Sequence, residues 1–419
     1  MAYLPESLKL SSHEVQQQIE DYKHLHSNPE LSHQEYQTAK FIERRFNELE
    51  LGEGVTREVW RIGETGVVLS LSRGEGPVVA FRADIDGLPL KEKADRSYAS
   101  QATGTLDGNE VPLMHGCGHD THITSALYAA QLWAADPGNW QGTALFIMQP
   151  AEEVADGAQT MVEAGLWEQV PHPEIIFGQH VWPDKSGHFI VSAGEMMTAA
   201  DSMKVTVFGS GAHGSQPENS IDPIVLGAAM ITRLQTIVSR EVAPLEAAVV
   251  TVGMFQGGFK ENIIPESAVF TLNVRTFNPE VREKVLNSIH RIIEGEAVVA
   301  GAPEPKIEHL SGFPATINDE QETASLQEAF IQQFGQDAVA TDPAMKAMGS
   351  EDFSDLATAL GVPYVFWFFG GYNEHRFTSG ETIYSNHSPY FSPDPEVTLE
   401  QGTYAALTAL YSKLGNVSG

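Results

Sequence analysis

Cysteine is almost absent from this sequence, because only Cys117 occurs among its 419 residues. A single cysteine excludes an intramolecular disulfide, and a thiol that serves as a metal ligand suits a reducing compartment. The N-terminal stretch MAYLPESLKLSSHEVQQQ also lacks the basic and then apolar pattern of a secretory signal peptide. We therefore predict a cytoplasmic protein.

Positive charge, long apolar runs and nucleotide-binding motifs are scarce or missing as well. Asp and Glu number 56 against 25 Lys and Arg, and the resulting net charge of -31 repels nucleic acid and anionic membranes. The longest apolar runs, such as 362–369, are far shorter than the ~20 residues that a membrane span needs. No Gly-x-Gly-x-x-Gly turn and no P-loop follows a predicted strand. We therefore expect no nucleic acid, no membrane and no nucleotide cofactor as a partner.

Side chains that bind metals are concentrated in one short stretch. Residues 114–122 read MHGCGHDTH and contain three His, one Asp and the only Cys. Thiolate, imidazole and carboxylate hold zinc-like ions, and Cys117 and His119 can aim at one centre from a turn. A polar loop beside a small buried cysteine is the alternative. Gly116 and Gly118 favour the metal site, because they let the backbone crowd a ligand.

Further carboxylates and one histidine lie near the ends of predicted strands. Asp84 and Asp86 are two residues apart and face the same side of their strand. They either solvate a turn, bind the metal directly or orient a ligand histidine, and the last role is favoured over direct binding. Glu152 and Glu153 follow a later strand. The dipole of the next helix alone favours acidic residues there, but one carboxylate can bind a metal while the other acts as general base. His180 is either a satisfied core residue or a member of the same crevice.

The length and the order of predicted elements indicate two domains. The chain exceeds the size at which a single core stops growing. Between about 192 and 309 the pattern is strand, helix, strand, strand, helix, strand, which is the ferredoxin-like β-α-β-β-α-β unit. We predict an α/β domain in two parts, 1–190 and 311–419, interrupted by an inserted α+β domain, 191–310.

Hydrophobic periodicity and breaker residues predict the individual elements. Residues 12–51 read as two helices joined by a turn at 26–30. The other predicted helices span 120–136, 156–165, 221–242, 279–300, 320–334, 351–360 and 396–414. The predicted strands span 55–60, 66–72, 77–85, 142–149, 174–182, 202–208, 247–255, 267–277, 306–310 and 363–369.

Ten separated stretches, in order along nearly the whole chain, resemble one enzyme family. It is the cocatalytic-metal amidohydrolases of the aminoacylase and carboxypeptidase clan, which include hippurate hydrolase, auxin-conjugate hydrolases and N-acyl-amino-acid deacylases. The resembling stretches are 24–26 with 29–32, 82–89, 114–122, 149–153, 178–180, 211–223, 262–265, 275–277, 349–353 and 387–389.

The resemblance implies a two-metal site and a role for each matching residue. Two divalent ions are expected, zinc or manganese in the first place and cobalt or nickel as alternatives. Glu152 would be the general base and later the general acid. The implied metal ligands are Cys117, His119, Glu153, His180 and His387, with Cys117 shared between the ions. The residues expected behind them are Asp84, Asp86 and Asp120, and those expected to contact substrate are His213, Asn262 and Arg275.

The resemblance also implies an aminopeptidase-like α/β/α catalytic domain with a ferredoxin-like lid, through which a homodimer can form. Two features depart from the family pattern. Glu218 stands after Pro217 where the family usually has a histidine, and the segment 370–386 is longer and more polar than the short glycine turn expected there. Both bear on substrate preference.

These observations predict a metal-dependent hydrolase of N-acyl amino acids or related small amides. A catalytically silent relative that binds a metal and a small molecule is the alternative. Since silent relatives lose the base or the ligands, the presence of Glu152 and of all five ligand residues favours an enzyme. A cysteine nucleophile at Cys117 is a third interpretation, and it is weaker because metal ligation would consume the thiolate.

Overall fold

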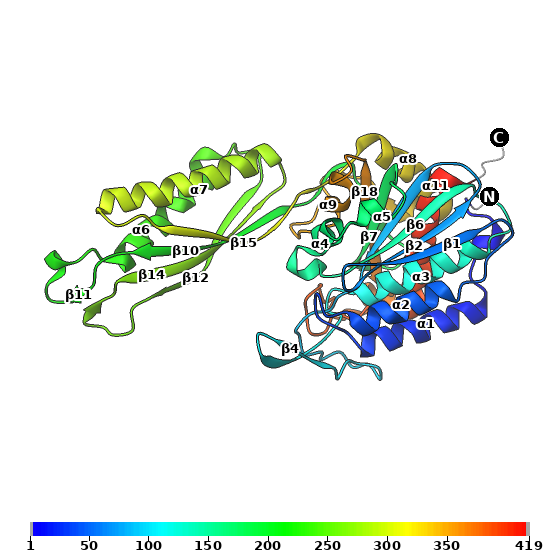
Figure 1. Ribbon diagram of the computed structural model, residues 1–419, viewed down its shortest axis with the longest axis horizontal. Coiled ribbons are helices and arrows are strands. Elements are labelled where there is room, and N and C mark those ends of the chain that lie inside the picture. The colour runs from blue at the N-terminus through cyan, green and yellow to red at the C-terminus, as the bar shows by residue number, and fades with distance from the viewer. Residues whose placement is uncertain (1–2, 416–419) are drawn as a thin grey trace. The chain divides into compact units, whose positions relative to one another are not determined.

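The computed structural model describes residues 3–415 and divides them into two compact units (Figure 1). The first unit contains the described residues up to Met196, together with Ile317–Lys346 and the residues from Asp352 onward. The second unit contains Met197–Thr316 and Ala347–Glu351. The second unit is therefore inserted into the chain of the first.

An eight-stranded sheet forms the centre of the first unit, in the order β1-β2-β6-β3-β7-β18-β8-β17. β6, β3, β7 and β18 are neighbours and run parallel to one another. Their carboxyl ends therefore lie along one edge of the sheet, where open α/β sheets form their ligand sites. The strands are β1 (Thr56–Ile62), β2 (Gly66–Arg73), β3 (Val78–Asp84), β6 (Gly142–Gln149), β7 (Ile175–Lys185), β8 (Phe189–Ile190), β17 (Val339–Ala340) and β18 (Tyr364–Tyr372).

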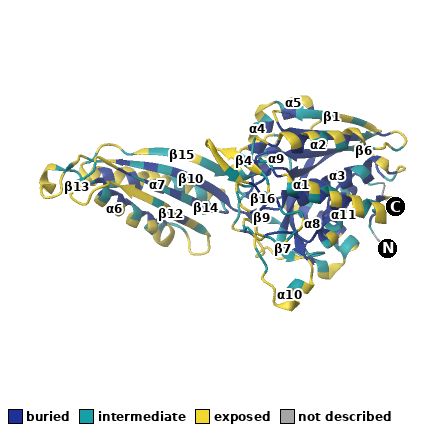
Figure 2. Cartoon of the chain, turned by 90° about the horizontal axis from the view of Figure 1, so that it is seen from below, coloured by how far each residue is buried: buried dark blue, intermediate teal, exposed yellow. Residues whose placement is uncertain are grey.

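Helices cover both faces of this sheet (Figure 1). α2, α3, α8 and α11 pack on the face where Phe81, Phe146 and Trp367 contribute to the main core, and α4 and α9 pack on the other face. α3 is buried along nearly its whole length, as its dark blue colour in Figure 2 shows. The helices are α1 (Ser12–Ser27), α2 (Tyr36–Asn47), α3 (His119–Ala135), α4 (Gly157–Glu163), α5 (Leu166–Gln169), α8 (Glu320–Phe334), α9 (Ser354–Thr358), α10 (His375–Ser379) and α11 (Pro395–Leu414).

The second unit is a four-stranded antiparallel sheet, β12-β14-β10-β15, with two helices packed against it. The chain order is β10, α6, β12, β14, α7, β15, which is the β-α-β-β-α-β order. Asp222 and Asn278 cap the two helices, and each is followed by a proline at the first helical position. The main elements are β10 (Ala199–Phe208), α6 (Pro223–Thr236), β12 (Ala248–Gly257), β14 (Ser267–Thr276), α7 (Pro279–Ala300) and β15 (Lys306–Phe313). The predicted α/β fold class is confirmed.

Most predicted elements are confirmed, and the differences have local causes. α9 is shorter than the predicted 351–360, because the Asp352 carboxylate turns inward and accepts hydrogen bonds from Arg82 and from the Ala158 N–H. The predicted helix 221–242 is α6 followed by one π-helical turn, Ile237–Glu241.

A hairpin was not predicted, because its residues are mostly exposed and show no apolar alternation. It consists of β4 (Thr103–Leu106) and β5 (Asn109–Pro112). Asp107 and Gly108 form its turn with φ values of 51° and 78°, and an Asp-Gly pair is a known hairpin signal that the periodicity did not reveal. Among residues 3–415, no helix combines the length and the apolar character that crossing a bilayer requires.

Candidate metal centre

The five predicted ligands come from four segments of the first unit and converge at the carboxyl edge of its sheet. Cys117 lies in the loop before α3, and His119 is the first residue of α3. Glu153 is in the one-turn helix after β6, and His180 is on β7. His387 lies in the loop between α10 and α11, where it adopts a φ of 66°.

Cys117 lies in the middle of the cluster. Its Sγ is 3.3 Å from His180 Nε2 and 3.2 Å from His387 Nε2. His387 Nε2 is 3.3 Å from one carboxylate oxygen of Glu153, and the other oxygen is 3.8 Å from His119 Nε2. The donor atoms of the five residues therefore form a continuous series in which the thiolate can be shared by two ions.

The donor set fits divalent metal ions. His119 Nε2 and Glu153 Oε1 are buried and have no hydrogen-bond partner among the described residues. Buried polar atoms in this state are uncommon in folded proteins, and a bound cation would satisfy both. Thiolate and imidazole suit zinc, while carboxylates also suit manganese.

Surplus negative charge makes the site attractive to cations. Burial alone would lower the pKa of His119, but the carboxylates of Asp84, Asp86 and Glu153 outweigh it and raise the pKa to about 10. In the absence of a metal, His119 would hold a proton tightly. A divalent ion at His119 Nε2 would meet the same negative surroundings, so metal binding should release this proton.

The two other ligand histidines have opposite environments. Burial holds the pKa of His180 far below its usual range, so His180 is the neutral imidazole that binds metals. A hydrogen bond with Glu153 raises the pKa of His387. His387 is more than half exposed, which places it at the mouth of the site.

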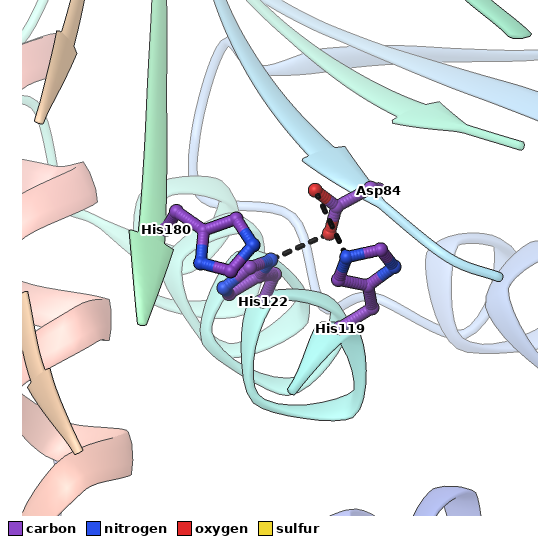
Figure 3. A group of neighbouring side chains, drawn as sticks. All are labelled: Asp84, His119, His122 and His180. Atoms are coloured by element: carbon purple, nitrogen blue, oxygen red, sulfur yellow. Dashed lines mark hydrogen bonds and ion pairs between the residues drawn. The ribbon is translucent and has the colours of Figure 1, made fainter. Parts of the chain in front are cut away.

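His122 is a site residue that the sequence interpretation missed. Figure 3 shows it beside His119 and His180, with Asp84 at the end of β3. Its Nδ1 donates to Asp84 Oδ1 at 2.5 Å, and its Nε2 accepts from the Val181 N–H at 2.8 Å. Both nitrogens are therefore used, and His122 supports the end of β7 rather than offering a ligand atom. The three-residue spacing from His119 on one helix face was the available signal.

Asp86 connects two of the candidate ligands. Its Oδ1 accepts a hydrogen bond from His119 Nδ1 at 3.1 Å. Its Oδ2 accepts one from the Glu153 N–H at 3.0 Å and one from Ser32 Oγ at 2.7 Å. Nδ1–H donation leaves His119 Nε2 available for a metal, which is the arrangement typical of metal-bound histidines.

Asp120 is placed differently from the prediction that it lies behind the ligands. Its Oδ2 is 2.6 Å from His26 Nδ1, on the side of α3 that faces α1. One residue along a helix rotates the side chain by about 100°, so Asp120 cannot face the same way as His119. Its pairing with His26 was not foreseen.

The turn that carries Glu152 has an unusual backbone. Ala151 and Ala155, on either side of it, have φ values of 54° and 65°, which non-glycine residues seldom adopt. Gly157 packs so closely that a Cβ there would lie 1.7 Å from the Pro150 carbonyl oxygen. The Glu152 carboxylate, 3.9 Å from His119 Nε2, is thereby held beside the candidate ligands.

The loop that carries Cys117 packs closely against β7 and the loop of His387. Gly118 has a φ of 89°, and a Cβ there would lie 2.5 Å from Val181 Cγ1. Asn386 donates from Nδ2 to the Cys117 carbonyl oxygen at 3.0 Å. The long segment 370–386 therefore ends in direct contact with the cluster.

The three predicted substrate residues belong to the second unit, where they occupy two places. His213 is exposed, and the N–H of the following Gly214 donates to the Asn262 carbonyl oxygen at 2.8 Å. Arg275, near the other end of β14, donates to the Met348 carbonyl oxygen at 2.9 Å and to Ser350 Oγ at 3.0 Å.

Known proteins resemble the chain in sequence and in structure. The family model described as Peptidase family M20/M25/M40 matches residues 80–411, a range that includes every candidate ligand. The N-acetyl-L-cysteine deacetylase of Bacillus subtilis is 35% identical over 384 residues, which cover 91% of this chain and 84% of that protein. The hippurate hydrolase of Campylobacter jejuni is 34% identical over 416 residues, covering 99% and 100%. The solved structure of the Bacillus subtilis YXEP protein, a dinuclear metal binding peptidase from the M20 family, matches with a TM-score of 0.73 and 30% identity, covering 94% of this chain and 98% of that one.

Proposed function

Because the chain belongs to peptidase family M20/M25/M40, we propose that it hydrolyses N-acyl amino acids or related small amides, with Glu152 as general base and acid. The chain is a metal-dependent amidohydrolase, as the family match and the similarity to a deacetylase and a hippurate hydrolase show. The observation that supports the residue roles is the position of Glu152 beside His119 and Glu153, two of the five candidate ligands at this edge of the sheet.

The proposed ligands of the two ions are Cys117, His119, Glu153, His180 and His387. Zinc and manganese suit this mixture of donors best, and cobalt or nickel could replace them. When bound, two such ions acidify a water molecule and polarise the scissile carbonyl. Cys117 is the shared ligand in this proposal, because its Sγ is close to both His180 and His387.

Glu152 is suited to moving a proton. Its side chain is only 5% exposed, so solvent does not compete freely for it. Its carboxylate takes the proton of the attacking water and then delivers it to the nitrogen of the leaving amine. Both steps use the same carboxyl group, which is charged when it takes the proton and neutral until it delivers it.

The two adjacent glutamates provide the sharpest test of this assignment. Glu152→Gln keeps the shape but cannot accept the proton, so metal should stay bound while kcat falls by roughly two to four orders of magnitude. Glu153→Gln should lose metal, since a neutral amide is a poor substitute for an anionic ligand. Metal analysis and turnover of the purified variants check this. Loss of metal from Glu152→Gln alone would reverse the two roles, and wild-type turnover in both would reject the site.

The substrate class is tested with N-acetyl, N-benzoyl and indole-acyl amino acids. We expect the metal-loaded enzyme to release the amino acid from at least one of these series, and Glu152→Gln to be the matched inactive control. Binding of the compounds without any hydrolysis would support a silent binding protein instead.

A homodimer through the second unit is also part of the proposal. β12 is an edge strand that pairs only with β14 among residues 3–415, and Val249 and Phe255 on it are 40% and 36% exposed. An exposed edge of this kind can pair with a second copy. Sedimentation should give a dimer that the double variant Val249→Lys, Phe255→Lys dissociates; a monomeric wild type would reject this part.

The positions of the three predicted substrate residues also support a dimer in which two subunits contribute to one site. Ser267 begins β14 beside the His213 region, and Arg275 is eight residues further on, roughly 26 Å away at the rise of a strand. A small amide cannot contact both ends of β14 at once. A substrate that contacts both His213 and Arg275 would therefore contact His213 of one subunit of the dimer and Arg275 of the other. A heterodimer of one His213→Ala subunit and one Arg275→Ala subunit should then contain one site with both residues intact. This heterodimer should be active, although each variant alone is impaired.

The proposed location is the cytoplasm. A thiolate that serves as a metal ligand needs reducing surroundings, and Cys117 is the only cysteine. Cell fractionation tests this, and recovery of the protein from an oxidising compartment would reject it.

A further inference from the structure

A buried carboxylate far away in the sequence contacts the turn that carries Glu152. Glu35, at the start of α2, is 0% exposed. Its Oε1 accepts hydrogen bonds from the Ala151 N–H at 2.9 Å and from the His33 N–H at 3.0 Å. Its Oε2 accepts one from Thr65 Oγ at 2.8 Å. These three hydrogen bonds hold the Glu35 carboxylate in position.

The contact with Ala151 occurs at one of the two alanines of this turn that have a left-handed backbone. With a φ of 54°, Ala151 is in the left-handed region, which non-glycine residues seldom adopt. Ala151 directly precedes Glu152, so its conformation sets the direction in which the Glu152 side chain leaves the backbone. A hydrogen bond that holds the Ala151 N–H therefore also controls the aim of the proposed general base.

A second contact from the same short segment reaches the other side of the turn. Ser32 Oγ donates to Asp86 Oδ2 at 2.7 Å, and the same oxygen accepts the Glu153 N–H at 3.0 Å. Residues 32–35 thus hold the N–H groups of the residues immediately before and immediately after Glu152, one directly and one through Asp86.

We propose that Glu35 is a positioning residue for amide hydrolysis, which holds Ala151 in its left-handed conformation and thereby aims the Glu152 carboxylate. This inference rests on the proposed role of Glu152. Glu35 itself touches neither substrate nor metal in this assignment. If Glu35 had a purely structural role, its loss would lower the stability of the fold but not the kcat of the folded enzyme. If Glu35 has the positioning role, its loss also lowers kcat.

The test compares Glu35→Ala with Glu35→Gln in the metal-loaded enzyme. Glu35→Ala should lower kcat by about 10- to 100-fold, since misplacement of a reacting group by about 1 Å has effects of this size, while KM and metal content stay near wild type. Glu35→Gln should keep kcat within about 3-fold, because its Oε1 can still accept from Ala151 and its amide can donate to Thr65 Oγ.

Glu30→Ala is the matched control. The Glu30 carboxylate accepts the N–H groups of Gln37 and Thr38 at the start of the same helix, but it has no contact with the turn. This variant should lose stability as Glu35→Ala does and keep wild-type kcat. Hydrogen exchange of the Ala151 amide in metal-free protein gives a second readout, and it should accelerate in Glu35→Ala only.

The outcomes distinguish the positioning role of Glu35 from the role of Glu152 as general base. Folded Glu35→Ala with wild-type kcat, or an equal loss of kcat in Glu30→Ala, overturns the positioning role. If Glu35→Ala does not fold, Thr65→Val removes the donor to Glu35 Oε2, and it should lower kcat severalfold at unchanged KM; unchanged kcat would again overturn the role. Wild-type turnover in Glu152→Gln rejects the proposed base, whereas the exchange rate of the Ala151 amide still reports the Glu35 contact by itself.

Discussion

The buried pair of carboxylates around His26 predicts a specific dependence of stability on pH. His26 lies in the last turn of α1, with Nδ1 2.6 Å from Asp120 Oδ2 and Nε2 3.0 Å from Glu92 Oε1. All three side chains are 0% exposed. Replacement by His26→Gln removes the imidazole that bridges the two carboxylates, and α1 loses its ionic contact with Asp120 of α3.

The magnitude follows from the environment of the imidazole. Burial alone would lower the pKa of His26, but the hydrogen bonds and charges of Asp120 and Glu92 outweigh it and raise the pKa from 6.5 to about 9. Because one pKa unit corresponds to about 1.4 kcal/mol, protonated His26 stabilises the folded protein by about 3 kcal/mol. This contribution is fully present below pH 6.5, the value in the unfolded chain, and is lost as the pH rises to about 9.

Urea denaturation of metal-free protein between pH 6 and 9.5 measures this contribution. We expect His26→Gln to lower the free energy of unfolding by about 3–5 kcal/mol at pH 6, where two buried carboxylates are left without their cation. The difference from wild type should shrink by about 3 kcal/mol towards pH 9.5. The exposed neighbour His24, replaced by Gln, is the control and should leave the pH dependence unchanged. A difference between wild type and His26→Gln that stays constant with pH would refute the argument.

Other predictions concern the metals and the buried charges beneath them. Chelation should abolish turnover, and zinc, manganese, cobalt or nickel should restore it to different extents, because ligand set and geometry control the bound water; full activity of metal-free protein in a turnover assay would contradict a metal mechanism. Cys117→Ala should lose metal and activity together in metal analysis, and retention of both would place the centre elsewhere. Arg82→Met should reduce the free energy of unfolding by about 3–5 kcal/mol in urea titrations, because Asp84 and Asp352 lose their buried cation. Arg44→Met, at an exposed position, serves as the control. A loss below about 1 kcal/mol in Arg82→Met would contradict the role of this network.

The secondary structure and most candidate ligands could be predicted from the sequence, because their signals are local. Ser11 and Glu14 form a capping box that starts α1, and the apolar periodicity predicted bounds such as 279–300 and 320–334, which α7 and α8 confirm. Cys117 and His119 were found by their chemistry within nine residues, and Glu152 and Glu153 by their place after a strand. Residue type and short-range spacing contain this information without any knowledge of the fold.

The residues that support the site could not be found in this way, because only the packing of distant segments brings them together. Glu35 is 116 residues from Ala151, and Asn386 is 269 residues from Cys117. In sequence, Glu35 is one acidic residue among 56 Asp and Glu, and nothing local distinguishes it from a solvated surface charge. Its burial is decided by the way the start of α2 lies against the turn that follows β6. The sequence therefore determined which chemistry is available, and the tertiary structure decided which side chains hold that chemistry in position, since hydrogen bonds between distant segments depend on how those segments pack.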